Sequence, residues 1–78
     1  MAYTELIATI ARALVDDPDS VEVEEIQEGN GVTIELRVAK ADIGKVIGKD
    51  GRTAQSMRTL LAAAAMKGGR RVHLDILD

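Results

Sequence analysis

Cysteine and aromatic residues are almost missing from this 78-residue sequence, which has no Cys, Phe or Trp, one Tyr, one Pro and one His. Without cysteine there is no disulfide framework and no thiolate chemistry, a composition that fits a reducing compartment. Without large aromatic side chains, the core must be built from Leu, Ile, Val, Met and Ala. No apolar stretch approaches the roughly 20 residues that cross a bilayer, and the N-terminus lacks a signal-peptide pattern, so we expect a soluble, cytoplasmic protein.

Catalytic and metal-binding residues are also scarce. The single histidine, His73, has only Asp75 beside it, which is too few ligands for a metal, so a surface histidine is the simpler interpretation. The stretch IGKVIGKDGR, residues 43–52, separates its first two glycines by three residues and follows its second Lys with Asp. A Walker loop needs two glycines separated by four residues, followed by Lys and then Ser or Thr. We therefore predict no catalytic residue, no metal site, no cofactor and no enzymatic activity.

Charge is distributed unevenly along the chain, although the net charge is only −3. Residues 1–36 contain nine acidic residues and one basic residue, a balance of −8. Residues 37–71 contain nine basic residues and two acidic ones, a balance of +7. The basic half contains the glycine-rich stretch and is the part that suits a polyanion such as nucleic acid. Chance segregation of solvated charges is the alternative interpretation.

Three segments show the apolar spacing of helices. Residues 4–16 form an amphipathic pattern that Thr4 is placed to cap. Residues 43–47 form a helix of one or two turns, and residues 52–66 form a longer one. The apolar stripe of this last helix is predicted to comprise Met57, Leu60, Leu61 and Ala64.

Three further segments alternate as strands do. Residues 21–28 form an acidic strand in which Ile26 is out of phase, indicating a bulge or a frayed end. Gly29-Asn30-Gly31 predicts a hairpin turn into a second strand at residues 32–38, and a third strand covers residues 72–76. The element order is therefore α-β-β-α-α-β. We predict a single α+β domain spanning residues 1–78, with helices covering one face of a three-stranded sheet.

The four residues Gly48 to Gly51 must reverse the chain between two helices, and a glycine at each end supplies backbone conformations that other residues resist. Lys49 and Arg52 lie at the start of the following helix, where its macrodipole makes a positive charge unfavourable by roughly 0.3 to 1 kcal/mol. Their placement indicates that an anion binds there. Free N–H groups, glycines and cations together are typical of a phosphate site.

The segment VIGKDGR, residues 46–52, resembles the signature of KH domains, in which a Gly-x-x-Gly loop joins two helices and holds about four single-stranded nucleotides. The element order is similar to that of the type II arrangement, and nearly the whole chain resembles the small stand-alone KH proteins of bacteria. The resemblance implies RNA contacts from the loop, phosphate contacts from its cations and an apolar groove under the bases. The predicted RNA-binding residues are Ile43, Lys45, Ile47, Gly48, Lys49, Asp50, Gly51, Arg52 and Arg58.

Two alternative functions are predicted from these residues and from the resemblance. The first is a regulatory or chaperone-like RNA-binding protein in the control of cell shape, growth and division. Its binding is expected to be weak, because Asp50 lies beside Lys49 and no aromatic residue lies near the loop to stack on bases. The second is a protein-interaction module that works through a partner. The resemblance implies a homodimer, or a heterodimer with a larger KH-domain protein, and Ala62 to Ala65 would allow another chain to approach closely.

Overall fold

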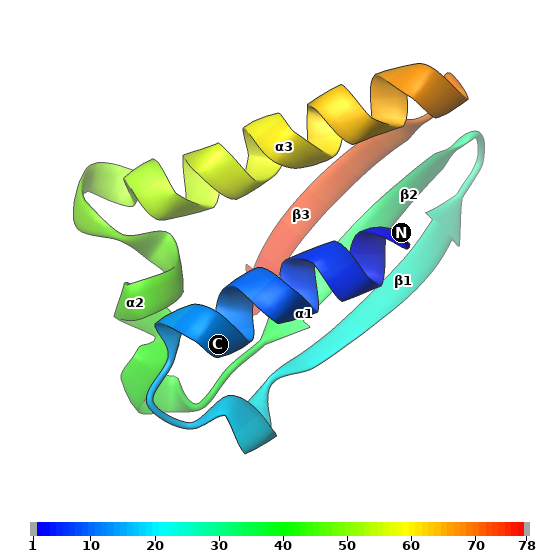
Figure 1. Ribbon diagram of the computed structural model, residues 1–78. Coiled ribbons are helices and arrows are strands. Elements are labelled where there is room, and N and C mark those ends of the chain that lie inside the picture. The colour runs from blue at the N-terminus through cyan, green and yellow to red at the C-terminus, as the bar shows by residue number, and fades with distance from the viewer. Residues whose placement is uncertain (1, 78) are drawn as a thin grey trace.

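The computed structural model describes residues 2–77, which form three α-helices and a three-stranded sheet (Figure 1). The helices are α1 (Tyr3–Leu14), α2 (Ile43–Ile47) and α3 (Arg52–Gly68), and the strands are β1 (Glu22–Glu28), β2 (Gly31–Arg37) and β3 (Arg71–Leu77). Short 3-10 turns precede β1 at Pro18–Ser20 and α2 at Lys40–Asp42, and a third covers Lys49–Gly51. The predicted α-β-β-α-α-β order and α+β class are confirmed.

The sheet has the order β1-β2-β3, with β1 antiparallel to β2 and β3 parallel to β2. The β1–β2 register runs without interruption from Glu22 opposite Arg37 to Glu28 opposite Gly31. The predicted bulge or fraying at Ile26 is therefore wrong. Ile26 is out of phase because its side chain, opposite Thr33, points away from the face that carries Val23 and Leu36.

All three helices belong to one side of the sheet, where α1 lies over β1 and β2 while α3 lies over β3 (Figure 1). Alternate residues of β2 point into this layer, and Val32, Ile34 and Leu36 are buried there. The remaining buried core is aliphatic, as the composition predicts: Ile7, Ala8, Ala11, Val21, Val46, Ala54, Met57, Leu61, Ala65 and Leu74. Within residues 2–77, no helix is both long and apolar enough to span a membrane.

Two details of the predicted helices are wrong. The first helix begins one residue before Thr4, and the carbonyl of Ala2 accepts the N–H of Leu6, so Thr4 lies inside the helix and does not cap it. The buried stripe of α3 is also rotated from the predicted one. Leu61 is fully buried, whereas Leu60 is 50% exposed. Neighbouring residues are about 100° apart on a helix, so periodicity alone did not identify which flank of α3 faces the sheet.

Candidate nucleic-acid interface

The connection between α2 and α3 is a tight loop that comprises Gly48, Lys49, Asp50 and Gly51. Gly48 has φ 79° and ψ 173°, a combination that is essentially restricted to glycine. Gly51 has φ 73° and ψ 12°, in the left-handed region. The prediction that both glycines supply unusual backbone angles is therefore confirmed.

The two glycines differ in their surroundings. A Cβ atom on Gly48 would lie 2.7 Å from Cβ of Thr53 and would also collide with the hydroxyl of that side chain. A Cβ atom on Gly51 would meet nothing within 4 Å. The first glycine is therefore packed against the start of α3, whereas the second is open to a ligand.

Asp50 also adopts a left-handed conformation, with φ 57° and ψ 24°. It is the only non-glycine residue with positive φ in the part of the chain that the structure describes. Aspartate tolerates this region better than most residues, because its short side chain can interact with the local backbone. The backbone geometry explains an acidic residue here, a reason that is separate from the charge of Asp50 beside Lys49 and that the sequence pattern does not indicate.

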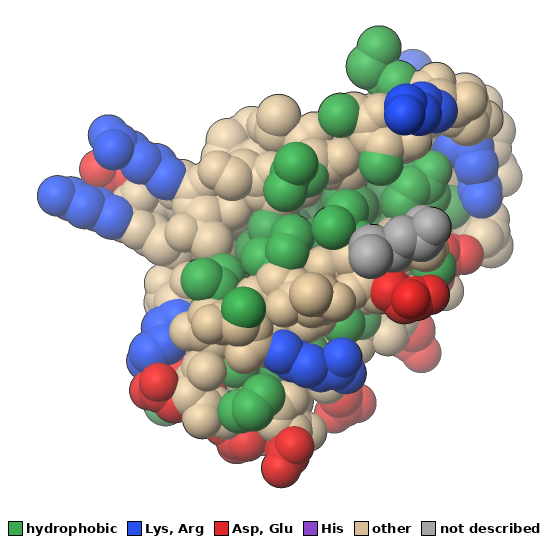
Figure 2. Space-filling model, viewed as in Figure 1, with side chains coloured by type: hydrophobic (Ala, Val, Ile, Leu, Met, Phe, Trp, Pro, Cys, Tyr) green, Lys and Arg blue, Asp and Glu red, His purple; other side chains and the backbone are tan. Residues whose placement is uncertain are grey.

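Lys49 and Arg52 lie on the solvent side of this loop, and both are exposed. Neither forms an ion pair with any residue between 2 and 77. Figure 2 shows basic side chains projecting from the end of the molecule where α2 and α3 meet. Gly51 precedes α3 and provides no side-chain cap, so the loop presents two free cations beside the uncapped start of a 17-residue helix.

Lys45, also predicted to contact phosphate, is held differently. Its ammonium Nζ lies 3.3 Å from a carboxylate oxygen of Asp16 and 3.4 Å from one of Asp42. These two carboxylates, Asp16 foremost, raise the pKa of Lys45 above its usual 10.5. Burial acts to raise the pKa of Asp42, but the N–H groups of Asp17 and Asp16 together with Lys45 outweigh burial and lower the pKa below 3.8. Lys45 is therefore already paired.

The other predicted contacts are spread along α2 and α3. Val46 is the residue of α2 that enters the core, while Ile47 is 39% exposed and Ile43 is half-buried. Arg58 is exposed and donates a hydrogen bond of 3.3 Å from Nη2 to the carbonyl of Leu74 on β3. The structure thus gathers Ile47, Lys49 and Arg52 around one loop and places Arg58 farther along α3.

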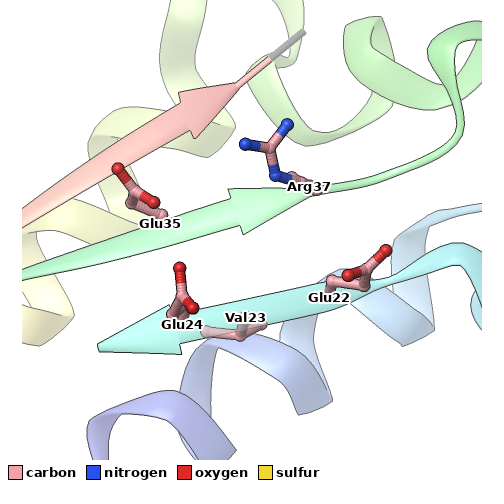
Figure 3. Close-up of a pocket in the computed structure, with 5 residues that line it drawn as sticks. All are labelled: Glu22, Val23, Glu24, Glu35 and Arg37. Carbon is pink, nitrogen blue, oxygen red and sulfur yellow. The ribbon is translucent and has the colours of Figure 1, made fainter. Parts of the chain in front are cut away.

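A hollow of about 150 Å³ lies on strands β1 and β2, and most of its lining is acidic. It is lined by Glu22, Val23, Glu24, Glu35 and Arg37 (Figure 3). Glu24 lies directly opposite Glu35 in the β1–β2 register. Three carboxylates around one guanidinium repel a polyanion, so this hollow does not suit nucleic acid. Among residues 2–77 there is also no group of three His, Cys, Asp or Glu side chains placed to hold a metal ion.

A Gly-x-x-Gly loop between two helices, within an α-β-β-α-α-β chain, defines a small KH domain of type II. The family model for the KhpA/KhpB KH domain matches residues 4–76, and the chain belongs to this family. The family is one of nucleic-acid-binding domains and not of enzymes, in agreement with the sequence prediction.

Several relatives match over nearly their whole length. The RNA-binding protein KhpA of Caldanaerobacter subterraneus is 58% identical over 73 residues, covering 94% of this chain and 97% of that protein. The protein of the same name from Halalkalibacterium halodurans is 55% identical over 73 residues, covering 94% and 96%. That from Aquifex aeolicus is 48% identical over 77 residues, covering 99% and 98%.

A solved structure is similar in fold. The crystal structure of Aquifex aeolicus Era Y63A bound to GDP.AlF4- aligns with a TM-score of 0.62 and 21% sequence identity. The alignment covers 95% of this chain and 29% of Era. At this identity the likeness concerns the fold alone.

Proposed function

We propose that this chain acts in the cytoplasm as a single KH domain that binds single-stranded RNA, gripping about four nucleotides through the loop from Gly48 to Gly51. One observation carries the proposal: Lys49 and Arg52 are exposed and unpaired within residues 2–77, beside two glycines with positive φ. The names of the relatives, RNA-binding protein KhpA, support the same ligand. A regulatory or chaperone-like role in the control of cell shape and division belongs to this proposal.

The residues of the loop have separate roles. Lys49 and Arg52 contact phosphate oxygens, and the open side of Gly51 admits the RNA backbone. The free N–H groups at the start of α3 add a favourable dipole for an anion. Ile47, with Ile43 behind it, forms an apolar floor for the bases. Arg58 reaches bases or phosphates farther along the strand once it leaves the carbonyl of Leu74.

Sequence discrimination is expected to be weak. The only aromatic side chain, Tyr3, has its hydroxyl 3.7 Å from the position of a Cβ on Gly68. Gly68 ends α3, and the loop precedes the first residue of the same helix, so Tyr3 lies at the opposite end from the proposed RNA site. Stacking on an aromatic ring contributes about 1 to 3 kcal/mol per base, and this domain lacks that contribution at its loop.

Fluorescence anisotropy of a labelled, mixed-sequence single-stranded RNA tests the proposal. Lys49→Asp is compared with Arg12→Asp, which changes the net charge by the same amount at an exposed position in the last turn of α1. We expect Lys49→Asp to abolish binding at low salt and Arg12→Asp to retain most of it, with circular dichroism verifying that both variants fold. Equal losses from both variants would show a non-specific charge effect and would reject the loop as the site.

A second candidate function, association with another chain, is favoured by the outer surface of α3. Leu60 is 50% exposed and Met66 is 81% exposed, and Ala62 and Ala63 between them are exposed as well. Large apolar side chains with small ones beside them are typical of a surface that packs against another chain. We propose that this surface forms a homodimer, or a heterodimer with a larger KH-domain protein of the KhpB type.

Light scattering coupled to size-exclusion chromatography tests the second candidate. Leu60→Asp is expected to shift a dimer to a monomer, while Lys49→Asp leaves the dimer intact because the loop is not part of the interface. A monomeric wild-type protein at high micromolar concentration, alone and with a KhpB-type partner, would reject this function. The two functions are compatible, because pairing two weak RNA-binding domains raises their avidity.

A further inference from the structure

A buried carboxylate connects α2 to a part of the chain that is distant in the sequence. Asp42 immediately precedes α2 and is only 2% exposed. Its Oδ2 accepts the backbone N–H of Asp17 at 3.1 Å, across 25 residues of sequence. Its Oδ1 lies 3.4 Å from Nζ of Lys45, one turn along α2. The same Nζ lies 3.3 Å from a carboxylate oxygen of Asp16. The Asp42–Asp17 hydrogen bond and the Lys45–Asp16 ion pair therefore both join the start of α2 to the segment that follows α1.

That segment, Val15 to Val21, is itself well ordered by local hydrogen bonds. The hydroxyl of Ser20 donates to the carboxylate of Asp17 at 2.7 Å, and the N–H of Ser20 donates to the Asp17 carbonyl at 3.2 Å. The N–H of Val21 then donates to the carbonyl of Pro18 at 3.2 Å. Pro18 restricts the turn further, because its ring fixes φ. These hydrogen bonds and Pro18 therefore fix the conformation of the segment to which α2 is joined.

Helix α2 needs such a support. It has five residues, too few for a helix that is stable by itself, and Val46 is its only buried residue. The proposed RNA-binding loop continues directly from α2. The N–H of Gly48 donates to the carbonyl of Gly44 at 2.9 Å, and the N–H of Gly51 donates to the carbonyl of Gly48 at 3.1 Å. Any tilt of α2 is therefore passed to the loop.

We propose that Asp42 and Lys45 form a strut between α2 and the Asp16–Asp17 segment that positions the loop for RNA, and that Lys45 is a positioning residue and not a phosphate contact. The inference rests on the proposed RNA-binding function. If Lys45 turned toward a phosphate, the buried carboxylate of Asp42 would lose its counter-charge, and an unpaired buried charge is strongly unfavourable. Lys49 and Arg52 have no such commitment within the described residues.

The salt dependence of RNA binding separates the two roles of a lysine. Each phosphate contact on a single strand contributes about −0.7 to the slope of log affinity against log salt. We expect Lys49→Gln to reduce the slope by about this amount. We expect Lys45→Gln to keep the wild-type slope while weakening binding by about threefold to tenfold, in proportion to the fraction of molecules whose loop stays ordered. Lys45→Arg, which keeps the ion pairs, should restore binding.

Hydrogen exchange of the unliganded protein tests the strut without RNA. In Lys45→Gln the amides of Gly48 and Gly51 should exchange faster, while the amide of Ile34 in the centre of the sheet should change little. Lys40→Gln is the matched control, because Lys40 is an exposed cation next to α2 with no ion pair among residues 2–77. It should leave both exchange and affinity at wild-type values.

Three results would overturn the proposal: a slope that falls for Lys45→Gln as it does for Lys49→Gln, wild-type affinity in Lys45→Gln, or unchanged exchange at Gly48 and Gly51. If the wild-type protein does not bind RNA, the proposed function fails by itself, and the exchange experiment still decides whether the strut holds the loop.

Discussion

Gly48 and Gly51 are equivalent in the Gly-x-x-Gly motif, but the structure predicts that they tolerate alanine differently. Both have positive φ, so both substitutions strain the backbone. Only at Gly48 does the new methyl group also collide with a neighbour, the side chain of Thr53 in the first turn of α3. The comparison therefore separates backbone strain from steric overlap within one loop.

The magnitudes follow from the geometry of each site. Gly51→Ala places alanine in the left-handed region and should reduce the free energy of unfolding by about 1 to 2 kcal/mol. Gly48→Ala enters a region that is almost exclusive to glycine, at a cost of about 1 to 3 kcal/mol. Overlap with Thr53 adds about 1 to 3 kcal/mol, as overpacking does elsewhere. We therefore expect a total loss of about 2 to 6 kcal/mol for Gly48→Ala.

Urea unfolding followed by circular dichroism measures both losses, provided that the slope of the transition is unchanged. The double variant Gly48→Ala/Thr53→Ala should recover part of the overlap energy, because it removes the colliding hydroxyl while the backbone strain persists. Equal losses for the two single variants, or a smaller loss for Gly48→Ala, would refute the reasoning that Gly48 is packed against α3.

Four further predictions concern stability. Gly44→Ala should raise the free energy of unfolding by about 0.4 to 1 kcal/mol, because Gly44 is in a helix and a Cβ there meets nothing within 4 Å; a lower urea midpoint would contradict this. Leu61→Ala should cost about 2 to 5 kcal/mol and Leu60→Ala much less, so similar losses would refute the assigned burial. Asp42, with its lowered pKa, should stabilise the fold fully above pH 3.8 and lose this contribution as the pH falls below that value. Lys45, with its raised pKa, should lose its own contribution as the pH rises beyond 10.5, and a pH-independent stability difference between wild type and Lys45→Gln would refute this.

The order of the elements and the place of the loop could be predicted because both depend on local patterns. Residues 32–38 alternate with period two, and residues 52–66 repeat with the helical period, so each segment indicates its own structure. Glycine at 48 and 51 indicated a tight reversal for the same reason, since the backbone angles there exclude most other residues.

Which flank of α3 is buried could not be predicted, because Leu60 and Leu61 are chemically identical and differ only in their direction around the helix. The phase of Ile26 likewise depended on its pairing with Thr33 on a separate strand. The role of Asp50 required its backbone angles, which no pattern in the sequence states.

The sequence by itself determined a basic, glycine-containing turn between two helices of a small KH domain, because local spacing, backbone preference and charge are carried by neighbouring residues. Only the tertiary structure decided which cations of that turn are free. Lys45, Lys49 and Arg52 have the same charge, and among residues 2–77 the fold brings carboxylates to Lys45 and not to the other two. One of these is the exposed Asp16, in the segment that follows α1, and pairing across such a distance in sequence arises only when the chain packs.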